Sequence, residues 1–199
     1  MPLIGLTGGY ASGKSLVLSV FRELGAYIID CDQLARDVVE KGAEGLTKVK
    51  EAFGDGVLTA DGSLDREKMA AQVFSDEAKR KKLERILHPL IIGRVYQTAE
   101  DILRGGEDRM VIVDAPLLYE AGMEKKMAKV VVVVCPQEEQ IRRGMARDRL
   151  GQDEAMARIK AQAPLSQKAQ QADYIIDNSG DMQATMAAAS ALWQELRKL

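Results

Sequence analysis

The 199-residue chain is poor in the residues that build disulfide frameworks and metal centres. It has only two cysteines, Cys31 and Cys135, which lack the short CxxC spacing of a zinc or redox site. The sequence therefore excludes a disulfide-rich scaffold and favours a reducing compartment, with both cysteines as small buried hydrophobic residues. The one histidine, His88, has no partner at ligand spacing and no Ser-His-Asp arrangement around it, so a structural role is the simpler interpretation.

Long apolar runs and an excess of one charge are also missing. The longest clean apolar stretch, residues 130–135, is far too short to span a bilayer, and the chain begins without the basic and apolar segments of a secretory signal. The 28 Lys and Arg residues against 30 Asp and Glu residues leave a net charge of -2, whereas a general nucleic-acid binder would be basic. We expect a cytoplasmic protein without a membrane or nucleic-acid partner.

What the sequence does contain is a series of short apolar runs separated by helix-like stretches. Runs rich in Val and Ile are typical of strands that are buried on both faces of a sheet. Because strands and helices alternate, the pattern favours an α/β fold with a parallel sheet. The expected strands are residues 3–6, 26–29, 110–113, 130–135 and 174–176, and the expected helices are residues 14–24, 137–149, 153–162 and 184–199.

Residues 33–106 differ from this pattern because they contain no convincing strand. Charged helical stretches at 66–74 and 76–87 favour a helical insertion on one crossover of the sheet. Pro89 is expected to end the second of these helices. The basic run at 79–82 is most simply a solvated helix face. The length fits one domain that carries this insertion.

Residues 8–15 read Gly-Gly-Tyr-Ala-Ser-Gly-Lys-Ser and match the phosphate-binding pattern GxxxxGK[ST] at every required position. Glycines let the backbone take conformations that a side chain forbids and approach phosphate oxygens closely. The N–H groups of the loop and the positive end of the next helix then form an anion site. Lys14 would reach the β and γ phosphates of a nucleotide, and the Ser15 hydroxyl would ligate Mg²⁺.

Acidic residues follow two of the expected strands. Asp30 and Asp32 come after the second strand, where a spacing of two would place both carboxylates on one side of an extended backbone. One of them is a candidate to orient or deprotonate an acceptor hydroxyl, and the alternative is that Asp32 caps the next helix. Asp114 follows the third strand and is either a Mg²⁺-holding acid or a structural cap. The NKxD segment that reads guanine in GTPases is missing, which disfavours GTP hydrolysis.

Four arginines crowd the expected helix at 137–149 and its end. Arg143 and Arg147 are four residues apart and therefore lie on one face of that helix. A guanidinium is planar, stays charged and binds phosphate oxygens in pairs, so this face can close over phosphates. The alternative is an ordinary solvated helix face.

Seven ordered segments resemble the dephospho-coenzyme A kinase family over nearly the whole chain. They are GLTGGYASGKS from Gly5, DCDQLAR from Asp30, DGSLDR from Asp61, LHP from Leu87, DAPLLYE from Asp114, QIRRGMARDR from Gln140 and ADYIIDNSG from Ala172. The resemblance implies an α/β P-loop kinase with a five-stranded parallel sheet flanked by helices. It also implies a helical coenzyme-binding region at about 33–106 and an arginine-bearing lid at about 139–165. The implied reaction is ATP-dependent phosphorylation of the ribose 3′-hydroxyl of dephospho-coenzyme A.

The resemblance also implies roles for single residues. Asp32 resembles the family's candidate general base, and Lys14 and Arg143 complete the catalytic set that we expect. Ser15 and Asp114 stay the candidate Mg²⁺ ligands on the grounds given above. The residues that correspond to the family's ATP site are Gly9, Ala11, Ser12, Gly13, Lys14, Ser15, Leu16, Arg143, Arg147 and Asn178. The residues that correspond to its acceptor site are Asp32, His88, Leu117, Leu118 and Glu120.

Two positions depart from the loop GGxGSGKS[TS] that is common in the family. Ala11 replaces a glycine and requires a backbone conformation that a Cβ tolerates, whereas Leu16 replaces a hydroxyl residue. Neither is a required position, so we expect an effect on nucleotide affinity rather than on activity. Two alternatives stay open at this point: a P-loop kinase for another nucleoside or nucleotide, and a nucleotide-binding protein without transfer activity. The oligomeric state is left open as well.

Overall fold

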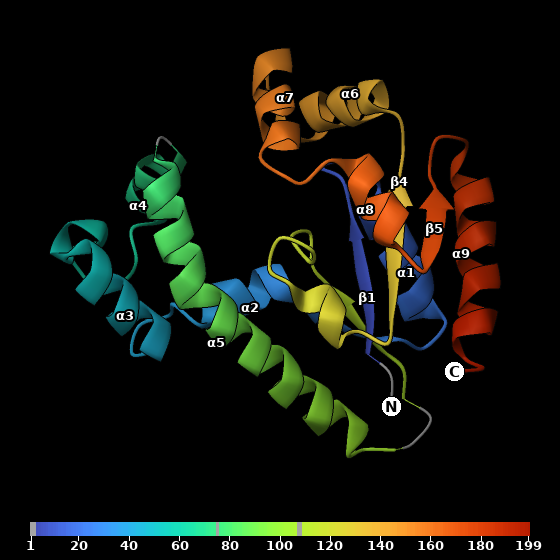
Figure 1. Cartoon of the computed structure of the whole chain (residues 1–199), viewed down its shortest axis with the longest axis horizontal. Helices are drawn as coiled ribbons and strands as arrows, with labels where there is room; N and C mark the ends of the chain where they lie inside the picture. The colour runs from blue at the N-terminus through green and yellow to red at the C-terminus, as the bar shows by residue number, and fades with distance from the viewer. Residues whose placement is uncertain (1–2, 75, 107–108) are drawn as a thin grey trace. The chain divides into compact units, whose positions relative to one another are not determined.

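The computed structural model describes residues 3–74, 76–106 and 109–199, which divide into two compact units. One unit holds the described residues up to Ile29 and those from Ala99 onward, and the other runs from Asp30 to Thr98. The first unit carries the sheet, and the second consists of helices (Figure 1). That the two act as a single kinase domain stays a prediction.

Five parallel strands form one sheet in the order β2-β3-β1-β4-β5. The central strand β1 (Leu3–Gly8) pairs in parallel with β3 (Val111–Asp114) and with β4 (Lys129–Val134). The edges are β2 (Tyr27–Asp30) and β5 (Tyr174–Asp177). The chain fills one side of β1 first and the other side later, so the strand order reverses beside β1. At such a reversal, ligands bind outside the carboxyl ends of the strands.

Burial along each strand follows its place in the sheet. Every residue of β1 and β3 is buried, whereas the edge strands β2 and β5 each bury a single residue. Central strands have neighbours on both sides and helices over both faces, which is why they read as continuous apolar runs. The five expected strands are confirmed, with ends that differ by one or two residues.

Helices α1 (Lys14–Glu23) and α9 (Met182–Leu196) pack together against the sheet (Figure 1). Phe21 and Trp193 are buried between them with ring centroids 5.8 Å apart. The four helices expected in this unit are confirmed, and one more, α8, was not expected because its sequence, LSQKAQQ, has little apolar character. The remaining elements are α6 (Gln137–Asp148), α7 (Gln152–Lys160), α8 (Leu165–Gln171) and the 3₁₀ helix η2 (Met123–Lys126).

The second unit has its own apolar core, in which Val49 and Val57 are fully buried. Its elements are α2 (Cys31–Asp37), α3 (Glu44–Phe53), the 3₁₀ helix η1 (Asp55–Val57), α4 (Arg66–Phe74) and most of α5 (Glu77–Leu103). Within its described residues, the only β pairing is an isolated antiparallel bridge between Leu58 and Leu64.

The prediction that Pro89 ends a helix is wrong, because Pro89 lies inside α5. A proline within a helix removes one backbone hydrogen bond and costs about 3 kcal/mol. Residues on both sides of it, including Leu87 before and Leu90 and Ile91 after, pack into the same core cluster. These side chains are partly buried, and the apolar surface that they remove from water stabilises the fold by about 25 cal/mol per Å², so their combined packing offsets the cost of the proline.

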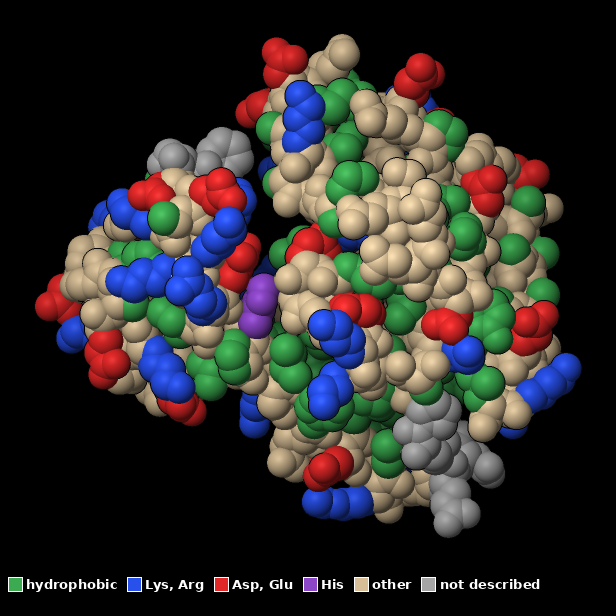
Figure 2. Space-filling view, in the orientation of Figure 1, with side chains coloured by type: hydrophobic (Ala, Val, Ile, Leu, Met, Phe, Trp, Pro, Cys, Tyr) green, Lys and Arg blue, Asp and Glu red, His purple; other side chains and the backbone are tan. Residues whose placement is uncertain are grey.

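The basic run at 79–82 forms a solvated helix face, as expected. Lys79 and Lys81 pair with acids three or four residues before them, and Arg80 pairs with Glu84. Lys and Arg side chains alternate with Asp and Glu side chains over the surface of this unit (Figure 2). The run is therefore largely neutralised by its own helix.

The remaining general expectations concern cysteines and membranes. Cys31 and Cys135 are both buried, and neither forms a disulfide, as the composition indicated. Burial raises the pKa of the Cys135 thiol, which makes that thiol unreactive. None of the helices in the described ranges combines the length and the apolar character needed to cross a membrane.

Candidate active site

The phosphate-binding loop joins the end of β1 at Gly8 to the start of α1 at Lys14. The residue before the helix is Gly13, with a left-handed backbone (φ 89°), and no side chain of the described residues caps the helix there. The first N–H groups of a helix have no partner within the helix and carry partial positive charge. The N-terminus of α1 is therefore open to an external anion.

The left-handed backbone continues at Ala11, which has a φ of 54° and is one of two residues other than glycine with positive φ in the described chain. This conformation costs a residue with a Cβ about 1–2 kcal/mol. The expectation that Ala11 takes a backbone tolerable to a Cβ therefore holds only at a cost. Packing of the surrounding residues holds the loop in this conformation, and a glycine at position 11 would adopt it with less strain.

Lys14 forms an ion pair with the Oδ1 atom of Asp114. The register of the sheet explains this, because β1 and β3 pair so that Leu6 lies opposite Asp114. Both side chains are largely buried, with exposed fractions of 17% for Lys14 and 12% for Asp114. The structure thus brings together the two residues predicted to carry phosphate and metal chemistry, Lys14 at the start of α1 and Asp114 at the end of β3.

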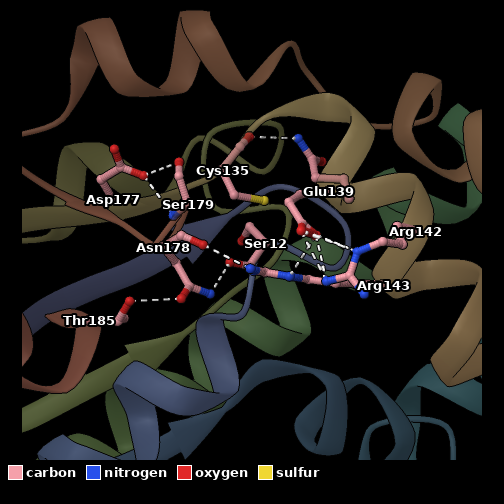
Figure 3. Close-up of polar contacts among 10 residues, drawn as sticks. Ser12, Cys135, Glu139, Arg142, Arg143, Asp177, Asn178, Ser179 and Thr185 are labelled. Carbon is pink, nitrogen blue, oxygen red and sulfur yellow. Dashed lines mark hydrogen bonds and ion pairs between the residues drawn. The ribbon is translucent and has the colours of Figure 1, made fainter. Parts of the chain in front are cut away.

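A polar network fixes the other side of the loop (Figure 3). The Asn178 amide lies after β5, donates to the main-chain oxygen of Ser12 at 2.8 Å and accepts from the Thr185 hydroxyl at 2.8 Å. The Arg143 guanidinium donates to the main-chain oxygen of Asn178 at 3.0 Å. A Cβ added to Gly13 would collide with the Asn178 side chain, so this position has room for glycine alone. Arg143 and Asn178 are therefore assembled directly beside the loop.

The side chain of Ser12 lies in the interior of the protein. It is fully buried, and its hydroxyl lies close to Gly8 with no hydrogen-bond partner among the described residues. Its main-chain N–H donates to the oxygen of Gly9 at 3.1 Å, which closes a turn. Leu16 similarly donates to the Gly13 oxygen at 3.0 Å, within the first turn of α1. Both residues shape the loop through the main chain.

The segment after β3 holds three predicted acceptor-site residues in different surroundings. Leu117 is exposed, whereas Leu118 is fully buried against Gly5 of β1. The Oε1 atom of Glu120 accepts from Lys168 Nζ at 2.8 Å and from the N–H of Ala163 at 2.8 Å. Glu120 therefore ties this segment to the start of α8, and a contact of any of the three with substrate stays a prediction.

Asp30 and Asp32 do not lie on one side of an extended backbone, because the helix α2 already begins at Cys31. Asp30 is its N-cap and accepts from the N–H groups of Asp32 and Gln33 at 2.8 and 3.1 Å. The alternative that Asp32 caps the helix is thus wrong. Asp32 lies in the first turn with an exposed side chain, and His88 lies half-buried in α5 of the same unit.

The predicted lid carries a second charged cluster. Arg147 donates from Nε and Nη2 to Asp148 at 2.7 and 3.0 Å, and these bonds hold the pKa of that carboxyl well below its usual range. Arg158 of α7 also donates to Asp148, at 2.8 Å. The Tyr10 hydroxyl donates to the same carboxylate at 2.6 Å, and burial is the main cause that raises its pKa. Arg147 is therefore engaged with an internal carboxylate.

A cavity of about 520 Å³ opens beside the loop at Gly9, between the residues that follow β4 and β5 and the segment before α8. Gln140 is buried on its wall, and its Oε1 atom has no hydrogen-bond partner among the described residues. Gln162, also on the wall, accepts from the N–H of Tyr10 at 2.8 Å. The cavity thus adjoins the part of the loop that the predicted lid already contacts.

Sequence reasoning missed several residues that hold this site together. Lys168 is almost fully buried and also donates to the oxygen of Pro116 at 2.9 Å, although lysine is rarely buried. Tyr10 occupies a position that the loop pattern leaves free, so the pattern says nothing about it. For Asp148 a signal existed, since it stands inside the arginine-rich segment that resembled the family.

Comparison with known proteins gives one consistent answer. The sequence profile of a family described as dephospho-CoA kinase matches residues 2–184. Relatives of that name include a protein of Bacillus licheniformis, 43% identical with 98% of both chains covered. Another, from Halalkalibacterium halodurans, is 44% identical over 92% of this chain and 90% of its own.

Solved structures resemble the chain over nearly its full length. A protein of Thermus thermophilus is 33% identical with a TM-score of 0.83, and a dephospho-CoA kinase from Campylobacter jejuni is 27% identical with a TM-score of 0.73. Each comparison covers 98% of this chain and 97% of the other. A shikimate kinase from Bacteroides thetaiotaomicron, 19% identical over 100% of this chain and 99% of its own, shares the fold with a TM-score of 0.53.

Proposed function

The chain belongs to the dephospho-CoA kinase family, and we propose that its phosphate-binding loop, its lid arginines and Asp32 carry out the family's reaction. That reaction transfers a phosphoryl group from ATP to dephospho-coenzyme A, which is the last step of coenzyme A biosynthesis. The acceptor atom that we propose is the ribose 3′-oxygen. The enzyme is a transferase, and a location in the cytoplasm stays a prediction.

One observation carries this proposal: α1 begins without a side-chain cap, and its first residue, Lys14, forms the ion pair with Asp114. Phosphoryl transfer needs positive charge around the β and γ phosphates and little covalent help from the protein. The main-chain N–H groups of the loop and the Lys14 ammonium supply that charge where water has limited access. Arg143, held beside the loop by Asn178, adds a further cation as charge spreads over the transferred group.

Asp32 is the residue that we assign to the acceptor hydroxyl. Asp30 caps the helix, and the Asp32 carboxylate lies exposed in the first turn of the same helix. A carboxylate that accepts a hydrogen bond from the 3′-hydroxyl orients its oxygen toward the γ phosphorus and can remove the proton as the new O–P bond forms. The bond from phosphorus to the bridging oxygen of ATP breaks at the same time, and ADP leaves.

The donor set beside Lys14 fits Mg²⁺. Mg²⁺ prefers oxygen ligands and is usually held by one or two protein groups together with substrate phosphates and water. The Ser15 hydroxyl and the Asp114 carboxylate are such groups, and no cluster of three or more acidic, His or Cys side chains competes with them in the described ranges. When bound, Mg²⁺ would neutralise charge on the β and γ phosphates.

The experiment that tests this function measures ADP release with a panel of acceptors. We expect dephospho-coenzyme A to stimulate release far more than adenosine or the nucleoside monophosphates. Stimulation by a nucleoside or nucleotide instead would identify a P-loop kinase of different specificity. ATP binding without stimulation by any acceptor would identify a nucleotide-binding protein without transfer activity and would contradict the proposal.

A further inference from the structure

Three side chains donate hydrogen bonds to the carboxylate of Asp148, at the end of α6. Tyr10 comes from the phosphate-binding loop, Arg147 from the same helix and Arg158 from α7. Asp148 itself is mostly buried, with 20% of its side chain exposed, whereas Arg147 and Arg158 are 57% and 51% exposed. The carboxylate is thus the centre of the cluster, and the two guanidinium groups lie at its rim.

The Tyr10 ring gives both guanidinium groups a surface to lie on. The Arg147 and Arg158 guanidinium carbons lie 5.1 and 5.6 Å from the ring centroid, within the range of cation–π attraction. The ring itself fits against Gly144, where an added Cβ would collide with it. A residue of the phosphate-binding loop therefore fixes the position of the arginines on α6 and α7.

Arg143 and Arg147 differ in what they contact, although they lie on one face of α6. Arg143 bonds the main-chain oxygen of Asn178 beside the loop. Arg147 donates two hydrogen bonds to the Asp148 carboxylate. A guanidinium that holds a carboxylate with two bonds cannot present the same edge to a phosphate. Arg147 must therefore leave Asp148 before it can bind phosphate in pairwise fashion.

The cluster allows that departure at small cost. If Arg147 turns away, the Asp148 carboxylate keeps its bonds to the Tyr10 hydroxyl and to Arg158 Nη1. A carboxylate left buried without partners would be costly, but this one is not left alone. Arg158 thus replaces Arg147 as the counter-ion of Asp148.

From this geometry we propose that Asp148 and the ATP phosphates compete for Arg147, and that Arg158 makes the exchange possible by holding Asp148. The inference rests on the proposed function only in taking ATP as the ligand of the loop. Asp148 and Arg158 are positioning residues, because they act on ATP through Arg147. The exchange links occupation of the loop to the arrangement of α6 and α7.

The test uses two substitutions. If the cluster were purely structural, both would change the Kd for ATP in the same direction. Asp148→Asn removes the competing charge, so the Kd for ATP should fall about fivefold. Arg158→Gln removes the replacement counter-ion, so Arg147 stays on Asp148 and the Kd should rise about fivefold; ion pairs this exposed have effects of that order. Calorimetric titration of the full-length variants with ATP and Mg²⁺, without acceptor, measures both. A Kd that rises in both variants, or does not change in either, would overturn the proposal.

Arg147→Gln supplies the control for the route of the effect. In the Arg147→Gln variant, adding Asp148→Asn should no longer lower the Kd for ATP, because the Arg147 guanidinium that Asp148→Asn would release is absent. An equal fall with and without Arg147 would also overturn the proposal. Arg158→Lys should restore most of the affinity, which separates loss of charge from loss of folding. Because ATP binding is measured without acceptor, failure of this inference is distinct from failure of dephospho-coenzyme A to stimulate ADP release.

Discussion

Two strand-to-helix junctions of the molecule treat the unpaired N–H groups at the start of a helix in opposite ways. Between β1 and α1, a glycine-rich loop leaves the first N–H groups of the helix without a side-chain cap. Between β2 and α2, the helix follows the strand at once, and the Asp30 carboxylate accepts from two of its first N–H groups. At both places an anion can accept from the first N–H groups of the helix. At α2 that anion is a side chain of the protein, whereas at α1 it would be a bound ligand.

The length and the glycines of the loop before α1 keep the start of that helix without a side-chain cap. A short connection lets the residue before the helix supply the cap, as Asp30 does. The longer loop before α1 carries left-handed residues at Ala11 and Gly13, and it keeps side chains out of the place where a cap would sit. The cost in backbone strain is balanced by packing around Asn178 and Tyr10, and the result is an anion site made of main-chain N–H groups.

The largest expected effect concerns Asp32, the exposed acid in the first turn of α2. Asp32→Asn should lower the rate of phosphoryl transfer by about 10²–10⁴-fold, the range for loss of a general base, with little change in the Kd for ATP. Asp30→Asn makes the same chemical change two residues away and should leave the rate nearly unaltered, since asparagine also caps helices well. Steady-state assays with dephospho-coenzyme A compare the two. Equal rates for Asp32→Asn and the unaltered chain would remove Asp32 from the mechanism.

The next effect concerns the cation at the α1 junction. Lys14→Ala should lower turnover by about 10²-fold or more, because one preorganised charge at the phosphates is lost. Lys129→Ala is the matched control: Lys129 also pairs with an aspartate, Asp173 at 2.9 Å, but at the amino end of β4, away from the loop. Turnover of the Lys14 variant close to that of the control would contradict the assigned role.

Backbone substitutions in the loop should change stability in opposite directions. Gly13→Ala should lower the free energy of unfolding by about 2 kcal/mol or more, because a Cβ meets Asn178 in a left-handed conformation. Ala11→Gly should raise it by about 0.5–1 kcal/mol, since relief of strain exceeds the extra entropy of glycine in the unfolded chain. Denaturant titration of both variants measures the difference. A destabilised Ala11→Gly variant would show that the left-handed backbone at this position is not strained.

The smallest expected effect concerns the cap itself. Asp30→Ala should lower the free energy of unfolding by about 1 kcal/mol, the usual cost of losing an N-cap, whereas Asp30→Asn should lower it by much less. Thermal unfolding of the two variants tests this. If both were equally destabilised, the negative charge of Asp30 rather than its hydrogen bonds would stabilise the start of α2. The two junctions would then differ in charge rather than in capping.

Much of the sheet and of the phosphate site could be predicted from local pattern. Buried strands such as β4 are short apolar runs, and the loop at 8–15 is a contiguous pattern whose chemistry follows from its own residues. The prediction at Pro89 failed because it used the local rule for proline, while packing of Leu87 and Leu90 into one core decided the helix. The prediction for Asp30 and Asp32 failed for a similar reason, since it assumed that the strand continued.

By itself, the sequence determined the α/β class, the five strands and the presence of an anion site with a lysine and a serine at its mouth. These features depend on residues that are neighbours in the chain, so propensity, burial pattern and glycine conformations suffice to specify them. Only the tertiary structure decided that Asp114 is the partner of Lys14, that Tyr10 of the loop contacts Asp148 of the lid, and that Lys168 is buried on Glu120. Those pairs are 100, 138 and 48 positions apart, respectively, and they meet because strand order and helix packing bring them together, which no local pattern encodes.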